Sequence, residues 1–458
     1  MPFAGLGWIA LLTAIVSTAN ALHYGWTPAP RTSIDDALAW ITAIAFALLY
    51  WLGIRTLKRS DRQYSLRELV VPVIPVVLIA FITIPYDSTD VFQYMSFGWA
   101  QAHYGLNPYT NVLRDIPDAT SDPMISARWM TSNKNPWLDF PLVYGFAVSH
   151  LSKAIAVLGF GNWWLTLALF KLVNLACFVA TVVLIDRAAK GFGLKRPDVA
   201  TYLFLWSPLI LQHHIANAHN DLLMGFLTVA ALVLLAGQAA VWSPAVLMVS
   251  AFVKYATLPL VPLSVLFIAK TRGWKQAVVG SVIASVIGVA MSFPYVTEVQ
   301  RFRFDLMRAQ LDKVTAGSLY AFVFYLYRWL SGADSPLTWL KVLLWGVALV
   351  WILWETWSFW SKPQPEVRDI ARLCCVVLVA IILVGSSQFY SWYLGMILPI
   401  ALLVERDGVS DFVVTLGGTH VLSLTSLSRK GIGYFVLTTG VAGLIRKMKM
   451  GAGSSRHP

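Results

Sequence analysis

Long apolar segments separated by short polar loops recur along almost the whole chain. Many of them approach the length of about 20 residues that a helix needs to cross a bilayer. The pattern predicts an all-α, polytopic transmembrane protein with about 12 to 14 membrane helices. The expected membrane helices occupy roughly residues 3–22, 36–56, 68–86, 163–185, 198–212, 222–237, 241–269, 276–294, 336–360, 369–387, 390–404, 410–426 and 432–446.

Three apolar segments are not expected to form a single continuous transmembrane helix. The segment 141–159 is interrupted by polar residues and 317–331 is short, so both are expected to be interfacial helices on the outer side. The segment 241–269 contains Pro259 and is flanked by basic residues at its end. We expect a broken hairpin with its tip near Lys254, because breaks at membrane depth are tolerated where they line a cavity.

The distribution of basic residues sets the expected orientation. The loop after the second apolar segment carries Lys58, Arg59, Arg62 and Arg67. Such loops are usually cytoplasmic. The segments 87–160 and 295–335 then become external loops, and both chain ends are cytoplasmic. Long loops of this kind in compact proteins are usually functional or disordered, and the aromatic content of the first favours function.

Composition supports one integral membrane domain over residues 1–458. Hydrophobic residues make up 57% of the chain and charged residues 13%, about half the charged fraction of a soluble protein. No polar stretch is long enough for a separate soluble domain. The net charge of +12 is attributed to cytoplasmic loops, so no nucleic-acid partner is expected.

The N-terminal segment and the cysteines are interpreted conservatively. Ala19-Asn20-Ala21 has the small residues of a signal-peptidase site, but no Lys or Arg precedes the apolar run. An uncleaved first helix is therefore expected. Cys177, Cys374 and Cys375 lie in apolar runs without metal-ligand or disulfide spacing, and we expect them to be buried packing residues.

Carboxylates at the mouth of the third apolar segment are the first candidate site. Asp87, Asp90 and Tyr94 have a spacing that places them on one face of a helix. Two neighbouring carboxylates raise the pKa of one of them, which suits a general base. The alternative is that one acid caps the following helix or lies in its first turn.

These residues belong to motifs that resemble the GT-C glycosyltransferases, most closely the polyprenol-phosphomannose-dependent mannosyltransferases. The resemblance covers about residues 80–400. The motifs that carry it are Asp90-Val91-Phe92-Gln93-Tyr94, Tyr104-Gly105-Leu106-Asn107-Pro108-Tyr109, Asn135 to Gly145, Asn217-Ala218-His219-Asn220-Asp221, the Lys254 segment, and Ser387 to Leu394. In the third motif, Val143 and Phe146 replace two prolines of the family pattern.

The resemblance implies that Asp90 is the catalytic base of an inverting transfer. The donor would be a polyprenyl-monophosphate sugar, with mannose as the hexose that the family suggests, and the acceptor a hydroxyl of a glycan or glycolipid. The protein would lie in the plasma (inner) membrane among membrane lipids, with its active site on the external or periplasmic side. The substrate-binding residues implied or inferred are Asp87, Tyr94, Asn107, Tyr109, Asn217, His219, Asn220, Asp221, Lys254, Arg301, Arg303, Gln388, Trp392 and Tyr393.

Several of these residues have alternative interpretations. Arg301 and Arg303 would stabilise the leaving phosphate, or they are solvated loop residues. Lys254 is a further phosphate ligand or a lysine that snorkels at a helix end. His213, His214 and His219 have too few suitable partners for zinc. No cofactor and no metal site are therefore predicted, and a divalent cation stays open.

Two other functions compete with glycosyl transfer. A lipid-linked sugar flippase or transporter would also contain buried charges and broken helices, but the internal repeats common in transporters are not visible in the sequence. A lipid-linked glycan polymerase or ligase would use a diphosphate donor. Release of polyprenyl phosphate from a monophosphate donor distinguishes the transferase from both.

Overall fold

The computed structural model describes residues 33–85, 88–117, 119, 121–126, 137–311, 313–315, 318–332, 337–404 and 407–419. Every regular element in these ranges is helical. Three helices are long and apolar enough to cross a membrane, or four if one bent pair counts as a span. The predicted all-α, polytopic membrane fold is thereby confirmed. The expected helices 3–22 and 432–446 lie outside the described residues, and the total of crossings stays a prediction.

Between residues 33 and 272, the described part of the chain forms ten α-helices of very different lengths. Asn162 begins the longest of them, because its side chain accepts a hydrogen bond from the Leu165 amide. The helices are α2 (Ser33–Arg59), α3 (Leu66–Val70), α4 (Ile74–Ile82), α5 (Asp90–His103), α6 (Phe146–Leu158), α7 (Trp163–Gly191), α8 (Pro197–Leu205), α9 (Asp221–Ala236), α10 (Ser243–Ala251) and α11 (Leu260–Arg272).

The second half contains two of the three candidate spans, α12 and α15. Gly273, with φ of 93°, separates α11 from α12 in a conformation that favours glycine. The helices are α12 (Trp274–Val296), α13 (Phe304–Leu311), α14 (Leu319–Ser331), α15 (Thr338–Ser361), α16 (Val367–Val379), α17 (Leu394–Ala401) and α18 (Gly408–Thr419).

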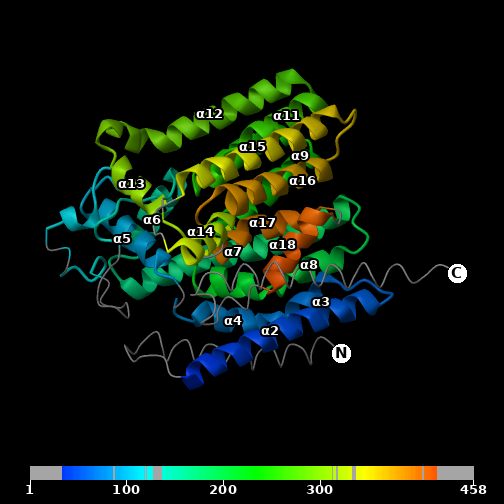
Figure 1. Cartoon of the computed structure of the whole chain (residues 1–458), viewed down its shortest axis with the longest axis horizontal. Helices are drawn as coiled ribbons and strands as arrows, with labels where there is room; N and C mark the ends of the chain where they lie inside the picture. The colour runs from blue at the N-terminus through cyan, green and yellow to red at the C-terminus, as the bar shows by residue number, and fades with distance from the viewer. Residues whose placement is uncertain are drawn as a thin grey trace.

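The helices form a bundle with the long loops gathered at one end. In Figure 1, α9, α11, α12, α15 and α16 run lengthwise, while α5, α6 and α13 lie together at one end with the loops around them. Helices α7, α10 and α17 each pack against α9. Helix α5 packs closely on α6, since a Cβ at Gly98 would lie 2.2 Å from the Ser152 carbonyl oxygen. The loop-rich end is thus joined to the rest of the bundle by packed helices.

Two expected continuous helices are broken. The segment 68–86 contains the 3-10 turn Val71–Val73 and ends as a helix at Ile82. Pro72 and Pro75 lack the amide hydrogens that a regular α-helix uses there. The segment 198–212 divides into α8 and the π-helical segment Ile210–Ala216. A second π-helical segment, Ala380–Gly385, continues α16.

The break expected near Lys254 is present. Helices α10 and α11 are separated by residues 252–259, which include the 3-10 turn Tyr255–Thr257. Lys254 itself has extended backbone angles, with φ of −146° and ψ of 134°. Helix α6, expected to be interfacial, has only 13 residues and is shorter than a membrane span.

Candidate active site

Five segments that are distant in the sequence meet at one buried polar site. They are the first turn of α5, the loop before α6, the segment between the π-helix Ile210–Ala216 and α9, the break between α10 and α11, and the 3-10 turn Ser391–Tyr393. Each segment places its side chains in the site from a helix end, a loop or a break between helices.

Asp90 is the carboxylate at the centre of this site. It is the first residue of α5 and only 9% exposed. The Tyr144 hydroxyl donates a hydrogen bond of 2.9 Å to Asp90 Oδ2. His219 Nδ1 lies 3.5 Å from the same oxygen, which is an ion-pair distance and the outer limit for a hydrogen bond. Asp90 is thus held by two groups from different segments.

A second acid in the site is paired with a lysine. Lys254 Nζ donates hydrogen bonds of 2.8 and 3.0 Å to the two carboxylate oxygens of Asp221. The same nitrogen lies 4.5 Å from the ring centre of Tyr393 and 5.4 Å from that of Tyr144. Lys254 is therefore a cation enclosed by aromatic rings and a buried carboxylate, which differs from a lysine that snorkels at a helix end.

The surroundings of Asp90 keep it ionised. Burial raises its pKa, but the nearby imidazole of His219, the charge of Lys254 and the hydrogen bond from Tyr144 lower it. The net result is a pKa below the ordinary carboxyl value, for a group that lies outside the candidate spanning helices. The expectation that a neighbouring carboxylate raises one of the two pKa values concerned Asp87 as the partner and stays a prediction. Asp87 lies outside the described residues.

An aromatic wall closes one side of the site. The Trp392 ring stacks on the His219 ring, with centroids 4.2 Å apart, and on the Tyr390 ring at 4.4 Å. Within the described residues, His219 Nε2 and both polar side-chain atoms of Asn220 are buried without a hydrogen-bond partner. Buried polar atoms are normally paired. These atoms are therefore candidates to bind a polar group of a substrate.

Main-chain pairing places Tyr144 beside Lys254. The Gly145 amide donates to the Val253 carbonyl at 3.2 Å, and the Ala147 amide donates to the Phe252 carbonyl at 2.8 Å. A Cβ at Gly145 would lie 2.4 Å from the Phe252 carbonyl oxygen. Glycine is required at this position because any side chain would push the two segments apart.

Asn107 and Tyr109 hold this loop from behind. Asn107 Oδ1 accepts a hydrogen bond of 3.1 Å from the Tyr109 amide, and the Tyr109 hydroxyl donates one of 3.0 Å to the Tyr144 carbonyl. Asn217 has a similar local role, since its Nδ2 donates to the Gln212 carbonyl at 2.9 Å. The contacts of these three predicted substrate ligands are thus internal ones that shape the site.

Of the remaining predicted residues, Tyr94 and Gln388 lie near the site, whereas Arg301 and Arg303 do not. Tyr94 packs edge-on against Tyr144 with centroids 4.9 Å apart, and Gln388 lies on the segment that leads to Trp392. Arg301 and Arg303 instead have side chains that are 71% and 42% exposed. Their nearest acids are Glu298 and Asp305, each at 3.9 Å. The structure does not bring these arginine side chains to Asp90.

The described residues contain no group of three His, Cys, Asp or Glu side chains placed to hold a metal ion. His214 Nδ1 lies 3.1 Å from the His219 carbonyl oxygen. His214 is therefore engaged with the main chain of the same segment that carries His219.

Tyr144 is the functional residue that sequence reasoning missed. It lies within the quoted stretch from Asn135 to Gly145, directly before the glycine that allows the close main-chain contact. A tyrosine followed by glycine at a helix start was the available signal. Its partner, however, is 54 residues away, so only the fold identifies the contact.

The fold and the site together define a class: a polytopic α-helical membrane protein with a buried, ionised aspartate where five segments meet. The comparison with known families is specific. The family model described as "Alpha-(1->6)-mannopyranosyltransferase, N-terminal domain" matches residues 3–270. The chain belongs to this family, and the resemblance to the mannosyltransferases is confirmed.

A curated relative supports the same family. The chain is 26% identical over 217 residues to "Alpha-(1->6)-mannopyranosyltransferase A" of Mycobacterium tuberculosis. The match covers 47% of this chain and 39% of the relative, so the chain spans well under half the length of that protein. No solved structure matches the chain.

Proposed function

We propose that this protein is an inverting mannosyltransferase that uses a polyprenyl-monophosphate mannose donor. The acceptor is a hydroxyl of a glycan or glycolipid. The observation that carries the proposal is the ionised carboxylate of Asp90, held by Tyr144 and His219 in a buried site. Membership of a mannopyranosyltransferase family supports the choice of sugar.

Asp90 is the general base in the proposed reaction. Its carboxylate takes the proton of the acceptor hydroxyl, and the acceptor oxygen bonds to the anomeric carbon from the face opposite the phosphate. The bond between the anomeric carbon and the phosphate oxygen breaks, and that oxygen keeps the electron pair. Because the low pKa keeps Asp90 ionised at neutral pH, the base is ready before the acceptor arrives.

Lys254 and His219 are the groups that would meet the donor. Lys254 supplies positive charge beside the site, where a leaving phosphate needs electrostatic stabilisation. The unpartnered Nε2 of His219 and the Asn220 amide would bind sugar hydroxyls, with Trp392 as the stacking surface. Arg301 and Arg303 have exposed side chains paired with Glu298 and Asp305 and are not assigned a role in the buried site.

The reaction is proposed to take place at the outer face of the plasma membrane. The support is the basic loop with Lys58, Arg59, Arg62 and Arg67, which favours a cytoplasmic position for the opposite side. No cofactor is part of the proposal, and the effect of added divalent cations is a direct measurement on the purified enzyme.

The test uses the purified full chain with a synthetic short-chain polyprenyl-phosphate mannose and a mannoside acceptor. Polyprenyl phosphate and an inverted glycoside are the expected products. In Asp90→Asn we expect kcat to fall by about 10²–10⁴-fold, the range typical for loss of a general base, while donor binding and yield survive. The exposed Asp305→Asn is the matched control.

Other outcomes would assign another function. A flippase would move the donor between leaflets and release no polyprenyl phosphate, and a polymerase or ligase would require the diphosphate donor. If Asp90→Asn kept near-normal turnover while Asp221→Asn abolished it, the base would be Asp221 and the proposed role of Asp90 would be wrong.

A further inference from the structure

Lys171 is a buried lysine on α7 that the proposed reaction does not use. Its residue is only 3% exposed. Its Nζ donates hydrogen bonds to the carbonyl oxygens of Ala80, at 3.2 Å, of Ala216, at 2.8 Å, and of Thr83. Among the described residues no carboxylate lies at ion-pair distance from it. The Nζ also lies 5.9 Å from the centre of the Phe81 ring. A buried amino group without a carboxylate partner is costly unless such neutral groups are well placed.

The three carbonyls belong to two segments that both lead into the active site. Ala80 and Thr83 lie at the carboxyl end of α4, from which the chain continues to Asp90. Ala216 ends the π-helical segment Ile210–Ala216, from which the chain continues to His219. Carbonyls at helix ends lack helical partners and carry partial negative charge, so a cation is favourable there.

The segment next to His219 is also strained. Ala218 has φ of 56°, an uncommon conformation for a residue with a side chain. Asn174, on α7 near Lys171, donates from Nδ2 to the Ala218 carbonyl at 3.4 Å. Strained backbone persists only where its surroundings hold it. Helix α7 therefore holds the segment before His219 at two points.

We propose that Lys171 is a positioning residue, which ties the segments carrying Asp90 and His219 to α7 and so sets the contact between them. The proposal rests on the function proposed above, in which Asp90 is the base. The titratable groups that face Asp90 are His219, Lys254, Tyr144, Tyr94, Tyr390 and Tyr393. Asp221 faces two of the same tyrosines, Tyr94 and Tyr393. Lys171 acts on Asp90 through His219 and not by direct contact.

The first test is kinetic. In Lys171→Met we expect kcat/KM to fall by about 10- to 100-fold, because a misplacement of about 1 Å has effects of that size. The acidic limb of the pH profile should also move to higher pH, since Asp90 loses part of its interaction with His219. Lys153→Met, at an exposed position of α6, is the matched control and should change neither quantity.

A double-mutant cycle separates positioning from general loss of structure. If Lys171 acts through His219, the effects of Lys171→Met and His219→Gln on the acidic limb should be strongly non-additive. Additive effects on the limb would overturn the proposal. Lys171→Gln keeps amide donors and serves if the methionine variant does not fold.

Hydrogen exchange tests whether Lys171 attaches the two segments to α7, and it does not depend on a measurement of enzyme activity. In Lys171→Met the peptides around residues 80–90 and 216–221 should both exchange faster, while α12 is unchanged. Asn174→Leu should affect only the second peptide, because the Asn174 side chain donates its hydrogen bonds to the carbonyls of Phe170 and Ala218. Unchanged exchange in both peptides would mean that Lys171 does not hold the two segments. Faster exchange with normal enzyme kinetics would mean that Lys171 has only a structural role. If the wild-type protein transferred no mannose, the proposed function would fail while the exchange result still decided the tie.

Discussion

At the scale of single residues, the acid strength of Asp90 is set by groups on other segments. The Tyr144 hydroxyl and the His219 imidazole reach the same carboxylate oxygen, and Lys254 adds its charge from behind the Tyr144 ring. A carboxylate arranged in this way stays ionised when the solution becomes acidic. The pH dependence of turnover should therefore report on these neighbours.

Tyr144→Phe tests the hydrogen bond to Asp90. The folded protein holds the pKa of Asp90 below its ordinary value, and the Tyr144 bond is one of the causes. Its removal should raise that pKa, so the acidic limb of kcat/KM should move to higher pH by about one to two units, since a hydrogen bond to a charged group contributes about 1.5–3 kcal/mol.

The control for this variant is Tyr327→Phe, at an exposed position on α14. It should leave the pH profile unchanged. An unshifted limb in Tyr144→Phe would mean that the hydroxyl does not stabilise the ionised carboxylate.

The identity of several site residues could be predicted from the sequence, because they belong to short local motifs. Asp90, His219, Asp221 and Lys254 were all predicted, and the structure brings them together. Their pairing could not be predicted: Lys254 contacts Asp221, 33 residues away, and Asp90 contacts Tyr144. Such contacts depend on how α5, α9 and the break after α10 meet, which no local pattern encodes.

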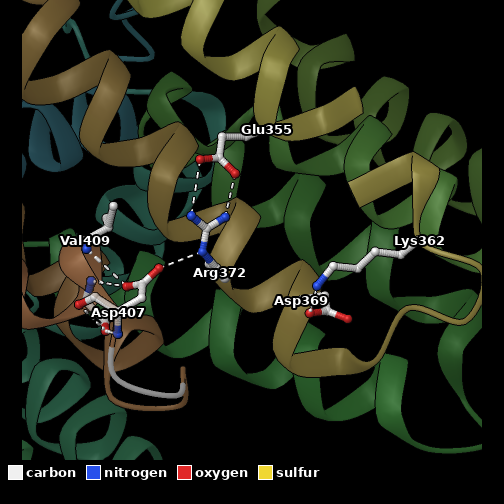
Figure 2. A network of polar contacts seen from close by, with 7 residues as sticks. Glu355, Lys362, Asp369, Arg372, Asp407 and Val409 are labelled. Carbon is white, nitrogen blue, oxygen red and sulfur yellow. Dashed lines mark hydrogen bonds and ion pairs between the residues drawn. The ribbon is translucent and has the colours of Figure 1, made fainter. Parts of the chain in front are cut away.

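At the scale of helices, Arg372 joins three elements at a polar network. Figure 2 shows its guanidinium between Glu355 of α15 and Asp407, at distances of 2.5 and 2.6 Å. Asp407 Oδ1 in turn accepts hydrogen bonds from the first amides of α18, at Val409 and Ser410. One side chain of α16 thus links the end of α15 to the start of α18.

Arg372→Met should destabilise the protein by about 1–3 kcal/mol. Loss of one partner from a buried ion pair costs about 3–5 kcal/mol, and solvent screening reduces this because the Arg372 side chain is 38% exposed. The measurement is thermal unfolding of the purified protein in one detergent.

Lys362→Met is the matched control in the same region. Lys362 forms a single ion pair of 2.6 Å with Asp369 and its side chain is 50% exposed. Exposed pairs contribute about 0.2–1 kcal/mol, so its unfolding temperature should change little. Equal effects of the two substitutions would show that the Arg372 network has no special role.

Helix positions were predictable where apolar length and helix ends agree. The expected helices 222–237, 276–294 and 336–360 correspond to α9, α12 and α15 within a few residues. The two π-helical segments were not predicted, because they share no composition: Ala380–Gly385 is apolar throughout, whereas Ile210–Ala216 contains Gln212, His213 and His214. Their geometry follows from tertiary packing and not from composition.

At the scale of the whole molecule, the loop-rich end carries the site. Asp90 and Asp221 lie in contact with shared neighbours, and the Arg303 amide donates to the Tyr109 carbonyl at 3.1 Å. The two predicted external loops therefore meet at one end of the bundle (Figure 1). The orientation of that end relative to the cell is a prediction from basic residues.

Cysteine labelling tests the orientation. The three buried cysteines are first replaced. Arg114→Cys and Arg301→Cys should then react with an impermeant maleimide on cells whose plasma membrane is intact and accessible from outside. Both positions have exposed side chains. Arg62→Cys, exposed on the opposite side of the predicted topology, should react only after permeabilisation. The reverse pattern would mean that the site faces the cytoplasm.

The π-helical segments have a consequence for the rotational phase of the chain. A π turn holds one residue more than an α turn, so it rotates everything that follows by about 100° relative to a regular helix. One such segment leads to His219 and the other to Trp392, and the two rings stack. The stacking of the two rings therefore depends on the lengths of both segments. A one-residue deletion in either segment would turn one ring away from the other, although neither ring had been altered.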